Sequence, residues 1–405
     1  MKEKLVLIGN GMAGMRTVDE LLKRAPDKYD ITVFGAEPHG NYNRIMLSPV
    51  LAGDKKLNEI IINDLQWYQD NNIMLHIGKT VIKIDRLNRK VITNDGTTAT
   101  YNRLILATGS LPIMLNVPGV ELEGVISFRD INDVNVMINT AKKHKKAIVI
   151  GGGLLGLEAA NGLMIQGMDV AVVHRSNTLM NQQLDQAASD FMRVELEAKG
   201  MQFLMNTETE ALLGKKRVEK VRFKDGSEVD ADLVIMAIGV RPNIELAQQS
   251  GIQCERGILV DDTLQTYTPN IYAVGECVQH RKQTFGLVAP LFEQAKVCAN
   301  HLMDMGIASY VTQVTATKLK VTGINLFSAG DFMGDELSET LLYQDPAHHI
   351  YKKLVLKDNK IIGTLLYGDT TDGNWYFSLL VQQKDISGFR EDVLFGQHQV
   401  DENRL

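Results

Sequence analysis

Two glycine-rich turns have the spacing that points most directly to chemistry. Residues 9–14 (GNGMAG) follow the apolar run at 5–8, and residues 151–156 (GGGLLG) follow the apolar run at 147–150. Each turn places G-x-G-x-x-G between an expected buried strand and an expected helix, where a tight turn and a helix N-terminus can hold a pyrophosphate. Two such turns in one chain predict two dinucleotides bound side by side, as in a flavoprotein that takes hydride from a nicotinamide.

The elements that must position these turns follow a repeated strand–helix–strand pattern. We expect a second strand at 31–34, hairpins around 81–84 and 90–92, and a strand at 104–107. The pattern restarts near residue 147, with a helix from Leu154 and strands at 170–173 and 233–237. The tail has β-rich runs at 352–356 and 361–366 joined by a turn at 357–360.

The predicted fold is α/β, with two Rossmann-like nucleotide-binding domains for FAD and NAD(P), the second inserted in the first, and a C-terminal α+β domain. The family resemblance given below implies boundaries of 1–113 and 242–310 for the FAD domain, 114–241 for the NAD(P) domain and 311–405 for the C-terminal domain, which it implies is of the interface or dimerisation type. The length of 405 residues accommodates two or three such domains.

Composition excludes several classes of function. A net charge of −6 argues against nucleic acid as a partner. No apolar run approaches the roughly 18 residues of a membrane helix, and the short run after Lys4 is no signal peptide, so we expect a cytoplasmic protein. The three cysteines form no C-x-x-C, which argues against a disulfide framework or an intrinsic iron–sulfur cluster, and no metal site is expected.

The residue after the second strand of each unit distinguishes the two nucleotides. Glu37 follows the strand of the first unit, where a carboxylate can accept both hydroxyls of an adenosine ribose. In the second unit the corresponding strand runs into His174 and Arg175, with no carboxylate. Arg175 could pair with a 2′-phosphate and His174 could serve a plain ribose, so NADPH is slightly favoured and the choice stays open.

The chain resembles the pyridine-nucleotide-disulfide-oxidoreductase superfamily in its single-flavin reductase branch. It is similar to the N-terminal FAD and NAD(P) module of assimilatory nitrite reductase large subunits and, more distantly, to rubredoxin reductases. The segments that carry the resemblance are 41–48 (NYNRIMLS), 107–109 (ATG), 151–158, 179–180, 183–185, 239–243 (GVRPN), 272–277 (YAVGEC), 285–290 (FGLVAP) and 317–323 (TKLKVTG).

This resemblance implies a role for each matching residue. Arg44 would lie along the FAD, Thr108 and Gly109 would close over it, and Glu276 would bond the ribityl chain. Pro290 would start a helix aimed at the flavin, whose N-terminus favours the negative charge of the reduced ring. Glu158 would reach toward the nicotinamide as a tentative catalytic residue. The full expected FAD set is Gly9, Gly11, Met12, Ala13, Gly14, Glu37, Arg44, Ala107, Thr108, Gly109, Gly275, Glu276 and Pro290. The full expected NAD(P) set is Gly151, Gly153, Leu154, Leu155, Gly156, Glu158, His174, Arg175 and Gly239.

One departure from the family concerns electron flow. Related peroxidases and oxidases place a redox cysteine just past the Leu-Ser step, whereas here Ser48 is followed by Pro49. Electrons from NAD(P)H would therefore leave FAD directly for a separate protein acceptor, preferably a sirohaem nitrite reductase or a nitrate reductase component of nitrogen assimilation. The nitrite reductase large subunits that this chain resembles continue into iron–sulfur and sirohaem domains that this sequence lacks. We therefore expect this chain to act as a dehydrogenase module.

Three alternatives stay open. The acceptor could be rubredoxin or ferredoxin, or the chain could be an NADH oxidase. From a different class, it could be a redox-sensing scaffold resembling apoptosis-inducing factor. A homodimer is a further expectation that the sequence leaves open. Cys277 and Cys298 are expected to be small packed residues rather than catalytic thiols.

Overall fold

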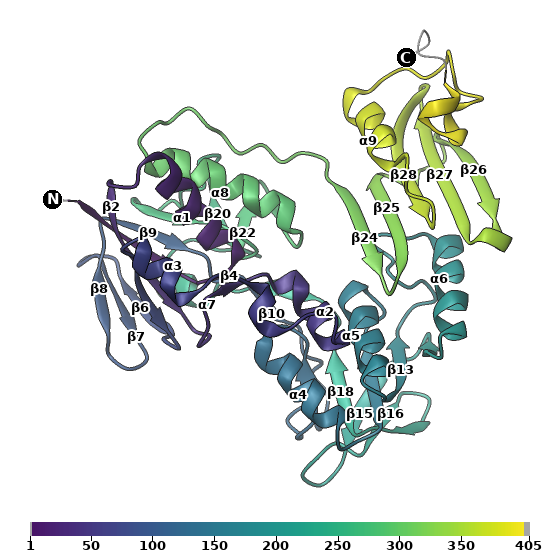
Figure 1. Cartoon of the computed structure of the whole chain (residues 1–405), viewed down its shortest axis with the longest axis horizontal. Coiled ribbons are helices and arrows are strands. Elements are labelled where there is room, and N and C mark those ends of the chain that lie inside the picture. Colours follow the sequence, from purple (N-terminus) through teal and green to yellow (C-terminus); the bar gives the residue numbers. More distant parts are fainter. Residues whose placement is uncertain (1, 401–405) are drawn as a thin grey trace.

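The computed structural model describes residues 2–400 as two parallel sheets with their helices and one C-terminal antiparallel sheet (Figure 1). This architecture confirms the predicted α/β class with two Rossmann-like units and a C-terminal α+β region. Met1 and residues 401–405, which the predicted first and last domains include, lie outside the described residues. The domain boundaries at 113, 241 and 310 stay predictions.

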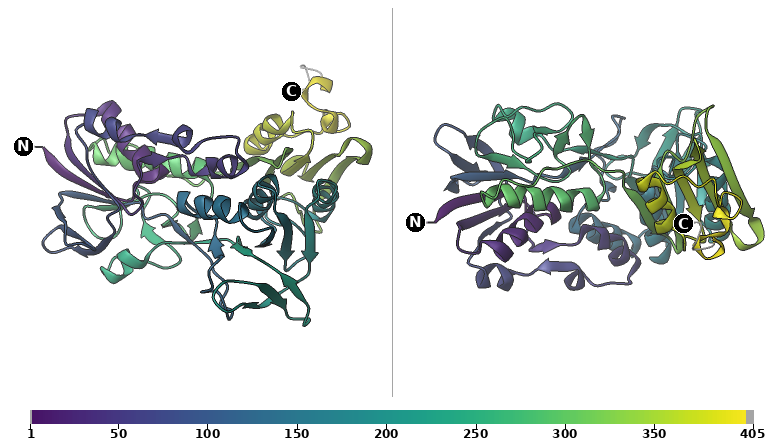
Figure 2. Two further views of the ribbon diagram at one scale, coloured as in Figure 1. Left: turned by 60° about the horizontal axis from the view of Figure 1, so that its bottom comes forward. Right: turned by 90° about the horizontal axis from the view of Figure 1, so that it is seen from above.

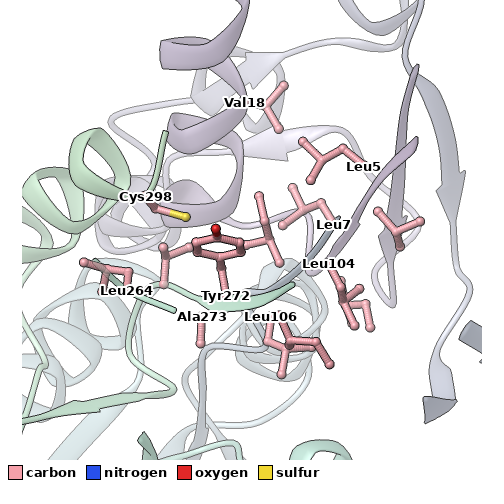
Figure 3. Packing of buried hydrophobic residues seen from close by; sticks show 14 of the residues in the cluster. Leu5, Leu7, Val18, Leu104, Leu106, Leu264, Tyr272, Ala273 and Cys298 are labelled. Carbon is pink, nitrogen blue, oxygen red and sulfur yellow. The ribbon is translucent and has the colours of Figure 1, made fainter. Parts of the chain in front are cut away.

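The first parallel sheet has the order β21-β9-β1-β2-β5. Its strands are β21 (Ile271–Ala273), β9 (Arg103–Leu106), β1 (Glu3–Ile8), β2 (Tyr29–Gly35) and β5 (Met74–Ile77). The central strands are almost wholly apolar because α1 (Met12–Arg24) and α8 (Val288–Leu302), which pack against each other, help to bury them. Figure 3 shows the resulting core, in which the Tyr272 ring and the Cys298 thiol lie among leucine and valine side chains.

The second parallel sheet has the order β11-β18-β12-β13-β14. Its strands are β11 (Val125–Ser127), β18 (Leu233–Met236), β12 (Lys146–Ile150), β13 (Asp169–His174) and β14 (Gln202–Met205). The helices that accompany it are α4 (Ile131–Ala141), α5 (Leu154–Ile165) and α6 (Gln186–Ala198). All of these strands lie between two segments of the first sheet in the sequence, so the second unit is inserted into the first.

The chain crosses between the units through two short strands that pair with each other. They are β10 (Ser110–Pro112) and β19 (Val240–Pro242), which are antiparallel. The remaining small strands form peripheral sheets, and the predicted hairpins around residues 81–93 are confirmed by β6 and β7. These strands are β3 (Asn41–Tyr42), β4 (Ile61–Asn63), β6 (Val81–Asp85), β7 (Lys90–Thr93), β8 (Thr98–Thr100), β15 (Thr209–Leu213), β16 (Lys220–Phe223), β17 (Glu228–Asp230), β20 (Ile258–Val260), β22 (Val278–His280) and β23 (Gln283–Thr284). The short helices are α2 (Leu47–Ala52), α3 (Leu65–Asp70) and α7 (Glu245–Gln249).

The C-terminal sheet is antiparallel, in the order β24-β25-β28-β27-β26. Its strands are β24 (Ala316–Val321), β25 (Ile324–Gly330), β26 (Glu339–Asp345), β27 (Ile350–Lys357) and β28 (Lys360–Tyr367), and α9 (Gly373–Gln382) covers one face. The predicted turn at 357–360 is the β27–β28 connection. Figure 2 shows this sheet and the N-terminus at opposite ends of the molecule. No helix within residues 2–400 is long and apolar enough to cross a bilayer.

Polar anchors hold the C-terminal sheet against α6. The Tyr351 hydroxyl donates to Asp185 Oδ2 at 2.6 Å, and the Lys353 ammonium lies 3.1 Å from the same oxygen. Asp185 also caps α6, accepting from the backbone N–H of Ala188 at 3.0 Å. One carboxylate therefore both starts a helix of the second unit and joins that helix to the C-terminal sheet.

Candidate functional site

The first glycine turn joins β1 to α1, and its outer glycines serve the fold itself. Gly9 has φ +109°, and a Cβ there would lie 2.1 Å from the Ala107 carbonyl oxygen. A Cβ on Gly14 would lie 2.9 Å from the Cβ of Ala107. Both positions therefore require glycine, because the turn packs directly against the end of β9.

The second turn repeats this arrangement between β12 and α5. Gly151 has φ +122°, and a Cβ there would lie 2.3 Å from the Ala237 carbonyl oxygen at the end of β18. A Cβ on Gly156 would lie 1.9 Å from the Gly151 oxygen. A Cβ on Gly14 would likewise lie 2.9 Å from the Gly9 oxygen, so the two turns are built on the same backbone contacts, although their sequences share little beyond the glycines.

The middle glycine of each turn has a different environment. A Cβ added to Gly11 or to Gly153 would meet no protein atom within 4 Å. Gly11 and Gly153 are also the N-caps of α1 and α5, where neither helix has a capping side chain or an acidic residue in its first turn. Each turn therefore presents free backbone N–H groups and open space, which fits the close approach of a dinucleotide pyrophosphate. The neighbouring Met12, Ala13, Leu154 and Leu155 begin these two helices.

A series of ion pairs and hydrogen bonds, called here the charged chain, begins at Glu37 near the first turn and ends at Glu276. The Arg44 guanidinium lies 2.5 Å from Glu37 Oε1 and donates to the backbone oxygen of Arg129. The Tyr42 hydroxyl donates to Glu37 Oε2 at 2.7 Å. Glu37 lies two residues beyond the end of β2, so its carboxylate is held near the turn by a cation and a hydroxyl.

The second carboxylate in the charged chain belongs to Glu276, which follows β21 in the sequence. It pairs with the Arg129 guanidinium at 2.5 Å and accepts from the Ser110 hydroxyl at 2.8 Å. Gly275 precedes it with φ +97°, and a Cβ there would lie 3.1 Å from the Cβ of Ala13 in the first turn of α1. The strand end is therefore brought close to α1, and two expected FAD residues meet there.

The crossing strands bring further expected residues to the centre of the molecule. The Thr108 hydroxyl donates to the Asn243 carbonyl at 2.7 Å, and the Asn243 N–H donates to Gly109 at 2.9 Å. Gly239 has φ +119°, and its carbonyl accepts from the N–H of Ile113 at 3.0 Å. Thr108, Gly109 and Gly239 thus lie where the chain passes between the two units.

A narrow cleft joins the two sets of expected residues. It is lined by Arg44, Leu47, Ser48, Phe128, Arg129 and Leu155. Leu155 belongs to the first turn of α5 and remains 41% exposed although it is apolar. The cleft therefore lies between an expected FAD residue, Arg44, and an expected NAD(P) residue, Leu155.

Glu158 is the hydrogen-bond partner of Ser48, which lines this cleft, and so bridges the two units. Its Oε2 accepts from the Ser48 hydroxyl at 2.5 Å, which links α5 to α2. Burial raises the pKa of the Glu158 carboxyl, and the Ser48 hydrogen bond acts in the opposite direction. The helices approach closely because Gly162 of α5 has no side chain where Leu51 of α2 packs against it.

The α8 helix begins with free backbone groups. It starts at Val288, two residues before Pro290, and neither a capping side chain nor an acid lies in its first turn. Pro290 therefore sits in the first turn, where its missing N–H costs no internal hydrogen bond. The Gln294 side chain accepts from the Gly275 N–H at 2.8 Å, which ties α8 to the loop that carries Glu276.

The three cysteines have environments that disfavour redox chemistry, although Cys277 directly follows Glu276 and interacts with Thr108. Cys277 and Cys298 are fully buried, and burial raises the pKa of both thiols. Burial also raises the pKa of Cys254 to about 11. A thiolate is the form that reacts, so these environments disfavour redox chemistry at any of the three.

Sequence reasoning missed several residues of the site. Arg129 joins the Glu37 and Glu276 ends of the charged chain and belongs to no recognisable motif. Ser48 ends the 41–48 segment of the family resemblance, but its hydrogen bond to Glu158 was not expected from the sequence. Asn10, inside the first turn, is fixed by the Tyr68 hydroxyl at 2.6 Å and by the His39 carbonyl at 3.2 Å. The position of Asn10 between two glycines was the one available signal.

The two glycine turns and the cleft between them agree with what comparison with known proteins finds. Residues 3–301 match the family described as pyridine nucleotide-disulphide oxidoreductase. The chain belongs to this family. Residues 316–384 match the rubredoxin NAD+ reductase C-terminal domain, which accounts for the antiparallel sheet. Membership makes the chain an oxidoreductase that uses FAD and NAD(P)H, and the open glycine turns fit both groups.

Similar proteins include two from Bacillus subtilis. One is a nitrite reductase (NAD(P)H), 51% identical over 95% of this chain and 48% of the relative. The other is an assimilatory nitrate reductase electron transfer subunit, 45% identical over 97% of this chain and 51% of the relative. The chain thus spans about half the length of these relatives. Among solved structures, the NADH:rubredoxin oxidoreductase of Clostridium acetobutylicum is 26% identical, with a TM-score of 0.81 over 96% of this chain and 97% of that one.

Proposed function

We propose that this oxidoreductase passes electrons from NAD(P)H through FAD to a separate protein acceptor, a nitrite or nitrate reductase component of nitrogen assimilation. The carrying observation is the open space beside Gly11 and Gly153. The outer glycines of both turns are required by the chain's own packing, whereas the middle glycines leave room that no protein atom uses. Space kept free at two helix N-termini supports two bound pyrophosphates.

FAD would be held by the first turn and by the charged chain that follows it. Glu37 would receive the adenosine ribose, Arg44 and Arg129 would lie along the phosphates, and Glu276 would meet the ribityl hydroxyls. Thr108, Gly109 and the N-terminus of α8 at Pro290 would surround the ring. Bound FAD would supply the chemistry of accepting a hydride and releasing electrons.

NAD(P)H would be held by the second turn, with its nicotinamide directed into the cleft between Arg44 and Leu155. Gly239 would line the same side. Glu158, held by Ser48, would position the nicotinamide rather than exchange a proton, because transfer between stacked rings requires no protein acid or base. The residues of this chain thus act by orientation and by excluding water.

Two observations support a separate protein as the acceptor: the names of the similar proteins and the unreactive environments of the cysteine thiols. The two Bacillus subtilis relatives are named for nitrite reduction and for electron transfer in nitrate assimilation. Within residues 2–400 no cysteine lines the cleft, and burial raises the pKa of all three thiols, so a thiol relay is disfavoured. A cytoplasmic location and a homodimer belong to this proposal as expectations.

A second candidate is reduction of rubredoxin or a similar small carrier. The match of residues 316–384 to the rubredoxin NAD+ reductase C-terminal domain favours it. Both candidates use the same chemistry and differ in the protein that receives the electrons.

The experiment that tests the proposal is an anaerobic stopped-flow reduction of the purified protein by NAD(P)H, followed by mixing with oxygen or ferricyanide. Slow reoxidation by oxygen with fast reoxidation by ferricyanide is expected for a reductase that awaits a protein partner. Fast reoxidation by oxygen would refute the proposal. Added rubredoxin, compared with an added nitrite reductase sirohaem component, then distinguishes the two candidates.

Variants at the middle glycines give the structural control. Gly11→Val and Gly153→Val place a side chain in open space at ordinary backbone angles, φ −90° and φ −85°, so each protein should fold. Gly11→Val should lose bound FAD, and Gly153→Val should keep FAD but lose reduction by NAD(P)H. Gly388→Val, at another glycine with nothing within 4 Å, is the matched control and should change neither property.

A further inference from the structure

Residues 42–60 precede the second unit in the sequence, but their buried apolar side chains lie in the core of that unit. These side chains are Tyr42, Leu47, Val50, Leu51 and Ile60. The same core contains Leu157, Ala160 and Leu163 of α5, and α2 lies alongside α5 (Figure 1). The segment therefore joins the two units through packed side chains as well as through the crossing strands.

Gly162 of α5 provides the space in which Leu51 of α2 packs. A Cβ on Gly162 would lie 2.6 Å from Leu51 Cγ and 2.7 Å from Leu51 Cδ2. Leu51 is fully buried, so its side chain has little room to turn away. Gly162 lies within a helix, where alanine is more favourable than glycine. The glycine is therefore explained by the close approach of α2 rather than by its own backbone.

One face of α5 both holds α2 and leads into the cleft. The residues on this face follow one another at intervals of three or four positions: Leu155, Glu158, Gly162 and Gln166. Glu158 accepts from the Ser48 hydroxyl at 2.5 Å, and Gln166 Nε2 donates to the Leu51 carbonyl at 2.7 Å. These two hydrogen bonds lie on either side of the Gly162 contact along the helix, so they fix α2 at that contact.

The position of α2 determines where part of the cleft lining lies. Arg44 belongs to a short 3-10 turn (Arg44–Met46) that continues directly into α2 at Leu47. Arg44, Leu47 and Ser48 line the cleft together with Leu155 of α5. A shift of α2 away from α5 would therefore change the separation between Arg44, which pairs with Glu37 of the first unit, and Leu155 beside the second turn.

We propose that Gly162 is a positioning residue that sets the spacing between the flavin and nicotinamide rings, because it allows α2 to lie directly on α5. The inference rests on the proposed function of the two turns. Carbon atoms in contact lie about 3.5–4.0 Å apart, so a Cβ at residue 162 would push α2 outward by about 1 Å. Hydride transfer requires reacting atoms about 3–3.5 Å apart, and a displacement of about 1 Å can cost about 100-fold in rate.

The test is Gly162→Ala in the full FAD-containing protein, with anaerobic stopped-flow reduction by saturating NADPH or NADH. The rate constant for flavin reduction should fall about 10- to 100-fold. The FAD content and the affinity for ADP-ribose, which lacks the nicotinamide, should not change, because neither glycine turn is altered. A second measurement does not depend on turnover: the long-wavelength absorbance of the dithionite-reduced protein with NADP+ or NAD+, which requires stacked rings, should weaken.

A second substitution in the Gly162→Ala background separates spacing from stability. Leu51→Ala removes the Cγ and Cδ atoms that the new Cβ meets, so α2 can return and the rate should recover about tenfold. The melting temperature should fall further, because a buried leucine side chain is lost. Gln166→Met removes the donor to the Leu51 carbonyl without adding bulk at the contact, so it should lower the rate to a smaller extent even if Gly162→Ala does not fold.

Gly373→Ala is the matched control. A Cβ on Gly373, at the start of α9, would lie 2.6 Å from the Phe327 ring, and neither residue lines the cleft. This variant should lower the melting temperature and leave the rate unchanged. An unchanged rate in Gly162→Ala and Gln166→Met, no recovery in the double variant, or an equal fall in Gly373→Ala would overturn the positioning role and leave the proposed function standing. No flavin reduction of the unaltered protein by NADPH or NADH would overturn both.

Discussion

Replacing Asp185 by alanine should destabilise the chain well beyond the loss of one helix cap. Its carboxylate accepts from the Ala188 N–H at 3.0 Å, from the Tyr351 hydroxyl at 2.6 Å and from the Lys353 ammonium at 3.1 Å. The side chains of Asp185 and Lys353 are 11% and 12% exposed, so little water is available to replace these contacts. The variant leaves a buried hydroxyl and a buried cation without their acceptor.

The expected magnitude follows from these separate losses. A lost aspartate cap costs about 1 kcal/mol. An unsatisfied buried hydroxyl costs about 1–3 kcal/mol, and breaking a buried ion pair about 3–5 kcal/mol. The losses share one carboxylate and are not additive, so we expect about 4 kcal/mol for Asp185→Ala. Tyr351→Phe keeps the cap and the cation and should cost about 1 kcal/mol.

The assay is urea unfolding followed by tryptophan fluorescence. The chain has two tryptophans, Trp67 in α3 and Trp375 in α9, so a Trp67→Phe background makes the signal report on the C-terminal region. Asp64→Ala is the matched control, since Asp64 caps α3 through the Trp67 N–H and joins no other unit. If Asp185→Ala costs no more than about 1 kcal/mol, as a cap alone would, the anchoring role of the carboxylate is refuted.

Three further outcomes are expected elsewhere in the chain. Burial raises the pKa of Glu158 above its reference value of 4.5, so its contribution to stability is present below that pH and is lost as pH rises through the folded pKa. The unfolding free energy of the unaltered protein minus that of Glu158→Gln should therefore fall with rising pH, and a flat difference would contradict the burial of the carboxyl. Gly156→Ala places a Cβ 1.9 Å from the Gly151 oxygen and should lower the melting temperature and the NAD(P)H affinity together; a variant with unchanged melting would show that the turn can open. Cys298→Ala should leave the rate of flavin reduction by NAD(P)H unchanged, and a large fall in that rate would restore a thiol to the mechanism.

The glycine turns and their flanking strands could be predicted from sequence because each rests on local constraints. Gly9 and Gly151 adopt a positive φ and have no room for a side chain, so glycine is required at both positions. Each glycine directly follows an apolar run, and the glycine and the run are both visible in the sequence. The hairpin at 81–93 and the β27–β28 turn were likewise predicted, since alternation and turn residues are close together in the chain.

The contacts that complete the site could not be predicted in this way. Ser48 meets Glu158 because α2 lies on α5 at Gly162, a packing between units that no spacing records. Arg129 reaches Glu276 across 147 positions. The Glu37 carbonyl accepts from the Gly78 N–H and the Ser176 carbonyl from the Asn206 N–H, a correspondence between the two units that residue spacing does not record.

The insertion also sets the order in which the two sheets can be completed as the chain is synthesised. The five strands of the second sheet lie between residues 125 and 236, whereas the first sheet needs β21 (Ile271–Ala273) beside β9. Until β21 emerges, one edge of β9 is without its neighbour, and an unpaired strand edge can associate with other chains. The second unit, which begins later in the sequence, can therefore complete its sheet first, and the first sheet stays incomplete until β21 has been synthesised.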